Sequence, residues 1–196
     1  MAKVFFTQNR QRLAERMPQN SIAVLFAGKA PCKRGDEYYP FSPDRNFYYL
    51  TGIEREDMIF VLAKYGAQTE EILFLPRDNG EMAKWVGANM TAEEAQEVSG
   101  ISALRPLDAF TEDFAALVFR QNLTTLCLDM EHRQWADTQT PALRFAAECR
   151  ANYPAMQFLD LYPIFGDLRL IKTPFELERM RKAMEITRKG LEAMML

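Results

Sequence analysis

The sequence predicts an α/β fold in which a mixed sheet of about six strands carries helices on both faces. Residues 21–26 (SIAVLF) form an unbroken apolar run, which is typical of a central strand buried on both sides. Three further short apolar runs, at residues 47–50, 58–62 and 71–75, are separated by turns, which favours an antiparallel meander. The second half of the chain alternates helical and strand patterns, and this alternation favours parallel pairing.

Length and composition limit the class of protein. The chain has 196 residues and a mass of 22.6 kDa, which fits one domain that buries roughly 70% of its unfolded surface. Its formal net charge of −3 and its pI of about 5.4 argue against a nucleic-acid-binding face, which needs a basic surface. No run of about 18 apolar residues is present, so we expect no membrane span and no membrane partner.

Three local features of the sequence bear on the cellular location of the protein and on its capacity for disulfide or metal chemistry. They are the N-terminus, the cysteines and the single histidine. Residues 1–17 lack the apolar segment of a secretory signal peptide, so we expect a cytoplasmic protein. Cys32, Cys127 and Cys149 are odd in number, lie far apart and form no C-x-x-C motif, which predicts buried, reduced thiols. His132 is the only histidine, so a His-rich metal site is impossible within this chain, and we expect this residue at the surface.

Two helices and a strand follow from local signals in the first part of the chain. Residues 7–16 place apolar side chains at helical spacing and are followed by a proline, so they predict a helix. The capping box Thr91–Glu94 opens a short helix that ends near Gly100. Residues 104–107 predict a brief strand.

Further along the chain, helices and strands alternate. Residues 108–120 predict a helix with one apolar face, and residues 123–128 predict a strand. Thr140 is a suitable N-cap with proline at the first helical position, so residues 141–149 predict a helix. Residues 157–161 predict the last strand of the sheet.

The last predicted helix begins at a second capping box, Thr173–Glu176, and runs to the end of the chain. Its apolar residues recur every three or four positions, which makes one continuous stripe. The stripe consists of Leu177, Met180, Met184, Leu191 and Met194. Neither a glycine cap nor a proline stop follows, so we expect the chain to end inside an element rather than after one.

The most distinctive stretch lies between residues 36 and 62. It contains six aromatic residues within twelve positions: Tyr38, Tyr39, Phe41, Phe47, Tyr48 and Tyr49. Aromatic side chains are costly to leave in water, so a loop this aromatic must pack against the rest of the fold. We expect an ordered aromatic loop, a strand at 47–50, a charged turn at 54–57 and a strand at 58–62.

This stretch resembles the signature of the N-terminal domain of the aminopeptidase P, prolidase and creatinase family. The residues that carry the resemblance are Asp36, Tyr39, Phe41, Asp44, Phe47, Tyr48, Tyr49, Leu50, Thr51 and Gly52. The acidic turn and the strand that follow also match. Ser42 and Arg45 depart from the usual pattern, so the local hydrogen bonding is expected to differ there.

A second match lies near the C-terminus. It resembles the linker and the first helix of the family's catalytic domain. The residues that carry it are Arg169, Leu170, Ile171, Lys172, Glu176, Met180, Arg181, Ala183 and Thr187. The resemblance therefore implies a two-part organisation, in which residues 1–168 form the N-terminal domain and residues 169–196 form the linker and first helix of an absent catalytic domain.

The resemblance implies a fold and a cofactor as well. Residues 1–168 would have the ribonuclease-H-like architecture of the creatinase and aminopeptidase P N-terminal domain. In the family, the catalytic domain has the pita-bread fold and holds two metal ions, usually manganese, on two aspartates, one histidine and two glutamates. None of those segments is present, so we expect no catalytic, cofactor-binding or metal-binding residue in this chain and no activity from it alone.

The parent protein implied by the resemblance is a metal-dependent Xaa-Pro aminopeptidase, which removes the N-terminal residue preceding proline from peptides. The role expected for this domain is oligomer assembly, through contacts with its own catalytic domain and neighbouring subunits, together with substrate gating. Trp85 is the candidate substrate-binding residue, because its segment resembles one that walls a neighbouring active site in relatives. The alternative for Trp85 is a core or interface tryptophan.

Other functions stay open at this point. A stand-alone peptide- or protein-binding module is one alternative, because family members without catalysis carry the same domain. Prolidase and creatinase are alternatives within the family, because their specificity residues lie mostly in the missing domain. Asp129 and Asp160, together with Asp36 or Asp44, could also form a metal-dependent nuclease cluster, although aspartates at strand ends usually cap turns or helices.

Overall fold

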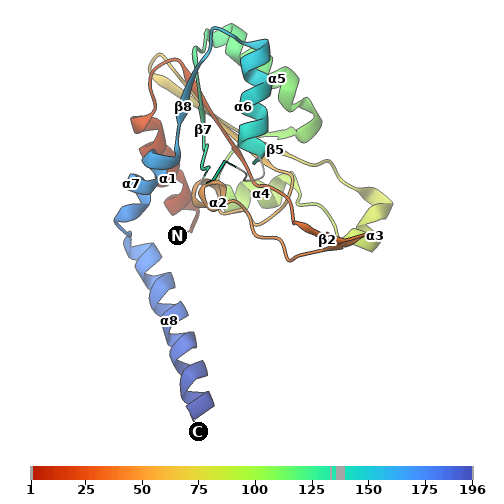
Figure 1. The fold of residues 1–196 in the computed structure, drawn as a ribbon, viewed down its shortest axis with the longest axis vertical. Coiled ribbons are helices and arrows are strands. Elements are labelled where there is room, and N and C mark those ends of the chain that lie inside the picture. The colour runs from red at the N-terminus through yellow and green to blue at the C-terminus, as the bar shows by residue number, and fades with distance from the viewer. Residues whose placement is uncertain (1, 133, 136–139, 196) are drawn as a thin grey trace.

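The computed structural model describes residues 2–132, 134–135 and 140–195, and within them a six-stranded sheet forms the centre of the molecule (Figure 1). The strand order is β6-β5-β4-β1-β7-β8. The strands are β1 (Ser21–Phe26), β4 (Ile59–Tyr65), β5 (Gln68–Leu75), β6 (Ala103–Pro106), β7 (Thr125–Leu128) and β8 (Gln157–Asp160). The predicted sheet of about six strands is therefore confirmed.

The sheet is mixed, as predicted. Val24 of β1 lies opposite Val61 of β4, and Val61 lies opposite Ile72 of β5, both in antiparallel pairing. β6 pairs with β5, β7 with β1 and β8 with β7, and these three pairings are parallel. The meander and the parallel units are both present, but the first strand of the meander is β1 rather than residues 47–50.

Helices cover both faces of the sheet, and each face has its own apolar cluster. One face carries α1 (Ala2–Arg16), α2 (Arg45–Thr51), α4 (Ala92–Ser99) and α7 (Tyr162–Leu170). The other face carries α5 (Phe110–Gln121) and α6 (Pro141–Asn152). Alternate residues of β1 serve the two clusters, Leu25 on the first face and Val24 on the second, as the two-residue period of a strand requires.

The prediction of a strand at residues 47–50 is wrong, because these residues lie in the helix α2. The Asp44 carboxylate caps this helix by accepting hydrogen bonds from the backbone N–H groups of Asn46 and Phe47, each at 2.9 Å. Gly52 ends it in a left-handed conformation, and its N–H donates to the Tyr48 carbonyl at 2.8 Å. The cap and the glycine stop outweigh the strand preference of the aromatic residues between them.

Other differences from the prediction are local. α7 was not predicted, since Pro163 and Gly166 are weak helix formers that hide its pattern. α1 begins at Ala2 rather than at residue 7, and it ends at Arg16 as predicted. A two-stranded hairpin, β2 (Cys32–Arg34) and β3 (Glu37–Tyr38), lies within the stretch predicted as loop.

The three predicted threonine caps are confirmed. The capping box of α4 forms between Thr91 and Glu94, and Gly100 closes that helix. The Thr140 hydroxyl accepts from the Leu143 N–H at 3.2 Å and so caps α6. At the start of α8 (Pro174–Met195), the Glu176 carboxylate accepts from the backbone N–H of Thr173 at 2.8 Å.

Cys127 and Cys149 are buried free thiols, as predicted, whereas Cys32 is exposed on β2. Burial raises the pKa of each of the two buried thiols to about 11, which keeps them protonated. His132 is exposed, in agreement with its predicted surface position. Among the described helices, none combines the length and the apolarity that crossing a membrane requires.

Candidate functional site

Trp85 lies on α3 (Ala83–Val86), a helix of four residues that follows a 3-10 turn at Gly80–Met82. In Figure 1, α3 and the neighbouring strand β2 form a projection at one side of the molecule. The Trp85 side chain is 83% exposed, and the adjacent Met82 and Val86 are 57% and 70% exposed. This exposure excludes a core role for Trp85 within the chain.

A small network of asparagine side chains holds this projection in shape. Asn79 Nδ2 donates to the Gly87 carbonyl at 2.8 Å, and Asn89 Nδ2 donates to the Arg77 carbonyl at 2.7 Å. The Asn89 backbone N–H donates in turn to Asn79 Oδ1 at 3.3 Å. Residues 77–89 are therefore closed into a compact loop that presents Trp85 to the outside. We call this loop the Trp85 arm.

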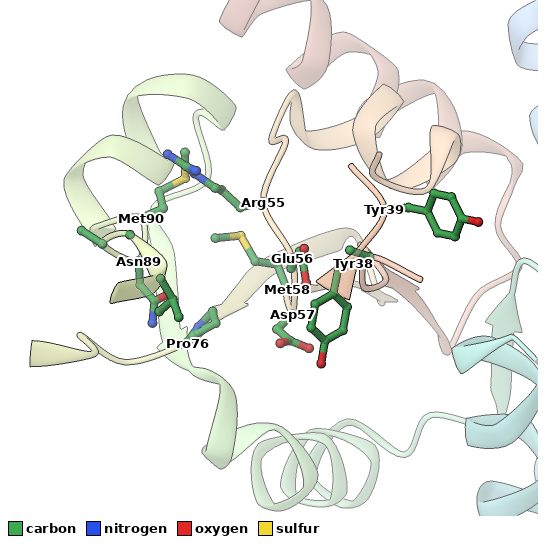
Figure 2. A pocket seen from close by; sticks show the side chains of 13 residues that line it. Tyr38, Tyr39, Arg55, Glu56, Asp57, Met58, Pro76, Asn89 and Met90 are labelled. Carbon is green, nitrogen blue, oxygen red and sulfur yellow. The ribbon is translucent and has the colours of Figure 1, made fainter. Parts of the chain in front are cut away.

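The hairpin of β2 and β3 stands beside the Trp85 arm and adds two more exposed aromatic side chains. Tyr38 and Tyr39 are 58% and 54% exposed. The Tyr39 N–H donates to the Pro31 carbonyl at 2.9 Å, which extends the hairpin beyond its two strands. Figure 2 shows Tyr38 beside Asp57, whereas Tyr39 points away from that residue.

A pocket of about 530 Å³ lies between the Trp85 arm and the hairpin. Its lining residues are Ala30, Tyr38, Tyr39, Arg55, Glu56, Asp57, Met58, Pro76, Val86, Gly87, Ala88, Asn89 and Met90. Met58 is almost fully buried, and Figure 2 shows Asn89 and Pro76 across the pocket from Tyr38. The volume falls in the range that holds small ligands. Trp85 itself is not part of the lining, although its neighbour Val86 is.

The charged turn at residues 54–57 forms one wall of this pocket. Asp57 has a φ of +57°, and its N–H donates to the Gly28 carbonyl at 3.1 Å. Its carboxylate lies 3.0 Å from Lys29 Nζ. The turn is thus held against the end of β1, and it directs polar groups toward the loop that carries Trp85.

The four aspartates considered for a metal cluster have structural roles, because each accepts hydrogen bonds or lies in a turn. Asp160 accepts from the backbone N–H groups of Met130 and Tyr162 at 3.0 and 2.9 Å. Asp129 accepts from Asn46 Nδ2, Asp44 caps α2, and Asp36 lies in the turn of the β2–β3 hairpin. Among the described residues, no group of three or more histidine, cysteine, aspartate or glutamate side chains is placed to hold a metal ion.

The Asp129 carboxyl is largely buried at the end of β7. Burial raises the pKa of Asp129 above its ordinary value, and the nearby charges of Asp44 and Asp160 add to the increase. The hydrogen bond from Asn46 opposes it. The arrangement suits a structural carboxyl at the end of β7 rather than a metal ligand.

The comparisons with known proteins agree with one another. The family model for the aminopeptidase P N-terminal domain matches residues 6–126. The chain is 28% identical over 190 residues to the Xaa-Pro aminopeptidase of Haemophilus influenzae, a match covering 97% of this chain and 42% of that protein. It is 25% identical over 187 residues to the Xaa-Pro aminopeptidase of Escherichia coli, covering 93% of this chain and 42% of that protein.

Solved structures show the same fold. A Bacillus anthracis structure described as an aminopeptidase P superimposes with a TM-score of 0.94 at 41% sequence identity, covering 97% of this chain and 46% of that one. The E. coli aminopeptidase P, at low pH, superimposes with a TM-score of 0.81 at 23% identity, covering 95% of this chain and 43% of that one. The chain thus spans less than half the length of these relatives.

The match of the family model over more than half of the chain agrees with the resemblance seen in the aromatic stretch and with the mixed sheet observed here. This chain belongs to the aminopeptidase P family, as its N-terminal domain.

Proposed function

We propose that the chain is the non-catalytic N-terminal domain of a metal-dependent Xaa-Pro aminopeptidase, and that it serves in oligomer assembly and substrate gating. The parent protein would remove the N-terminal residue that precedes proline from peptides, using two manganese ions held by its catalytic domain. The relatives are named Xaa-Pro aminopeptidases, which supports the proposed reaction. The chain covers only 42% of each of these two relatives, which supports a further domain in the parent protein. A cytoplasmic location is part of this proposal.

The observation that carries the gating role is the exposure of Trp85. A tryptophan that is 83% exposed, together with the exposed apolar residues Met82 and Val86, leaves a large apolar area in contact with water, which is unfavourable. Such a patch is typical of a surface that another protein covers. In our proposal the Trp85 arm reaches a neighbouring subunit, and the indole walls its active site so that short peptides fit and longer ones do not.

The Trp85→Ala variant of the full-length protein tests this role. We expect the KM for a proline-second tripeptide to rise, since the indole no longer covers the peptide, and we expect the preference for short over long peptides to weaken. Steady-state hydrolysis of peptides of increasing length, with manganese added, measures both effects.

Trp135→Ala is the matched control, because Trp135 is 99% exposed on a different loop. This variant should keep the wild-type KM at every peptide length. An unchanged KM across all lengths in Trp85→Ala would remove the gating role, and absence of any hydrolysis by the full-length protein would favour a stand-alone binding module instead.

A further inference from the structure

The pocket between the Trp85 arm and the hairpin has charged groups of both signs in its wall. Its charged lining residues are Arg55, Glu56 and Asp57, which all come from the turn between α2 and β4. Figure 2 shows Arg55 on the side of the pocket where Met90 lies, and Asp57 on the side where Tyr38 lies. The pocket therefore has a cationic end and an acidic end.

Two of these three charged groups are free to bind a ligand. Among the described residues, neither the Arg55 guanidinium nor the Glu56 carboxylate forms a hydrogen bond or an ion pair. The Asp57 carboxylate lies 3.0 Å from Lys29 Nζ, but a carboxylate has room for more than one donor. A ligand that carries both a carboxylate and an ammonium group would thus find a partner for each.

The middle of the pocket is apolar. Figure 2 shows Met58 between Arg55 and Asp57, and the Met58 side chain is almost fully buried. Val86 and Met90 also line the pocket, and Met90 packs against the apolar cluster that includes Met58. These side chains provide apolar contact for the part of a ligand that joins its two charged ends.

Both walls of the pocket are held in place before any ligand binds. Asp57 has a φ of +57°, which is uncommon for a residue with a Cβ atom, and such strained positions are frequent at ligand sites. The Asp57 N–H donates to the Gly28 carbonyl at 3.1 Å, which fixes the charged turn. The asparagine network fixes the Trp85 arm on the other side. Binding to a preformed pocket loses little conformational entropy.

We infer that this pocket binds short peptides whose two termini are free. Arg55 holds the α-carboxylate, and Glu56 and Asp57 hold the α-ammonium group, which the Tyr38 ring beside Asp57 also attracts. A simple anion would be repelled by the two carboxylates and a simple cation by Arg55, whereas a zwitterion is attracted at both ends.

The size of the pocket favours a peptide over a single amino acid. Its volume of about 530 Å³ exceeds that of a free amino acid and leaves room for two or three residues. The site uses no residue of a catalytic domain. Peptide binding here therefore goes beyond the proposed peptidase reaction and does not depend on it.

Titration of the 196-residue chain with trialanine tests the inference, because this peptide contains no proline and is not a substrate of the proposed reaction. Heteronuclear NMR of the backbone amides follows binding. We expect saturable shifts concentrated at residues 55–58 and 86–90. Trialanine amide and N-acetyl-trialanine should each bind about tenfold more weakly, since each lacks one of the two charged contacts.

Two variants assign each end of the peptide to its partner. Arg55→Gln removes the cation, so trialanine and its amide should bind with equal affinity. The double variant Glu56→Gln, Asp57→Asn removes both carboxylates, so trialanine and its N-acetyl form should bind equally. Asparagine is suitable at position 57 because it tolerates a positive φ.

Arg77→Gln is the control, because Arg77 is exposed, pairs with Asp108 and does not line the pocket. It should leave all three affinities unchanged. Equal binding of the three peptides by the wild type would overturn the inference, as would shifts elsewhere, no saturable shift, or an unchanged preference for trialanine over its amide in Arg55→Gln. Circular dichroism checks that each variant is folded, and for a variant that is not, the three peptides on the wild type decide.

Discussion

At Gly52 the backbone has a φ of +71°, a conformation that is strained for residues with a Cβ atom. A Cβ built there would lie 2.1–2.7 Å from ring atoms of Phe6. We predict that Gly52→Ala lowers the free energy of unfolding by about 2–4 kcal/mol, through backbone strain and overpacking. Gly66→Ala is the control, because Gly66 has a φ of +55° and open space around it; it should cost about 1 kcal/mol. Urea unfolding measures both, and equal losses would contradict the role of the Phe6 contact.

The buried carboxyl of Asp129 leads to a prediction about how the stability of the fold depends on pH. Its folded-state pKa is raised by burial, so the folded chain binds this proton more tightly than the unfolded chain does. The contribution of Asp129 to stability is therefore greatest below the unfolded-state pKa and is lost as the pH rises through the raised pKa of the folded state. Asp129→Asn removes this loss and keeps an acceptor for Asn46, so we expect it to be more stable than wild type at pH 7.

The measurement for Asp129→Asn is urea unfolding between pH 3 and pH 7. The advantage of the variant over wild type should grow as the pH rises. Asp167→Asn, an exposed change on α7, should show no such trend. A variant less stable than wild type at pH 7 would show that the ionised carboxylate's bond to Asn46 outweighs the cost of burying it.

Between elements, the buried Arg10 joins four parts of the fold. Its side chain is 1% exposed, and Nη1 of Arg10 on α1 donates to the Leu50 carbonyl of α2 at 2.8 Å and the Ser99 carbonyl of α4 at 3.0 Å. Nε of the same side chain donates to Glu71 Oε2 of β5 at 2.8 Å. The carboxylate partner holds the guanidinium in its charged form although burial lowers its pKa.

We predict that Arg10→Met costs about 3–5 kcal/mol, because it leaves Glu71 and two buried carbonyl groups without their donor. Adding Glu71→Gln should recover part of the loss, since no unpaired charge then remains. Arg120→Met on the exposed face of α5 should change stability by less than about 0.5 kcal/mol. Chemical unfolding of the four proteins gives the comparison, and a loss in Arg10→Met no larger than that of the control would refute the role of Arg10.

The elements also show which features a single sequence can predict. β1, β4 and β5 are apolar runs bounded by turns, and the caps at Thr91, Thr140 and Thr173 are short local patterns, so both were predicted. α2 was mistaken for a strand because its aromatic residues suit either state, and only the Asp44 cap and the Gly52 stop decide the outcome. Local signals predict an element reliably when no competing local signal is present.

At the scale of the whole molecule, the candidate site could be predicted only in part. Trp85 is a candidate only through the resemblance of its segment, and its exposure is not evident from the sequence. The pocket beside it is built from residues 38–39, 55–58 and 86–90, which come together only through the sheet. The groove that Phe5, Tyr48 and Phe175 line likewise joins the first helix to the last. Contacts between distant segments leave no periodic signal in either segment, so the sequence alone did not reveal these two surfaces.

The boundary between the N-terminal domain and the segment that follows can be tested by shortening the chain. No described residue of α8 is buried, and Phe175 packs against the first apolar cluster with its ring 4.8 Å from that of Phe5. A chain that ends at Lys172 keeps the bond from Arg169 to Asn46 and loses the packing of Phe175, which is worth about 1–2 kcal/mol. We therefore expect residues 1–172 to unfold in one cooperative transition, slightly below that of the 196-residue chain, and to associate less because the exposed stripe is gone. Circular dichroism on heating and sedimentation velocity measure the two effects. A shortened chain without a cooperative transition would show that α8 is part of the N-terminal domain, and the predicted boundary between residues 168 and 169 would then be wrong.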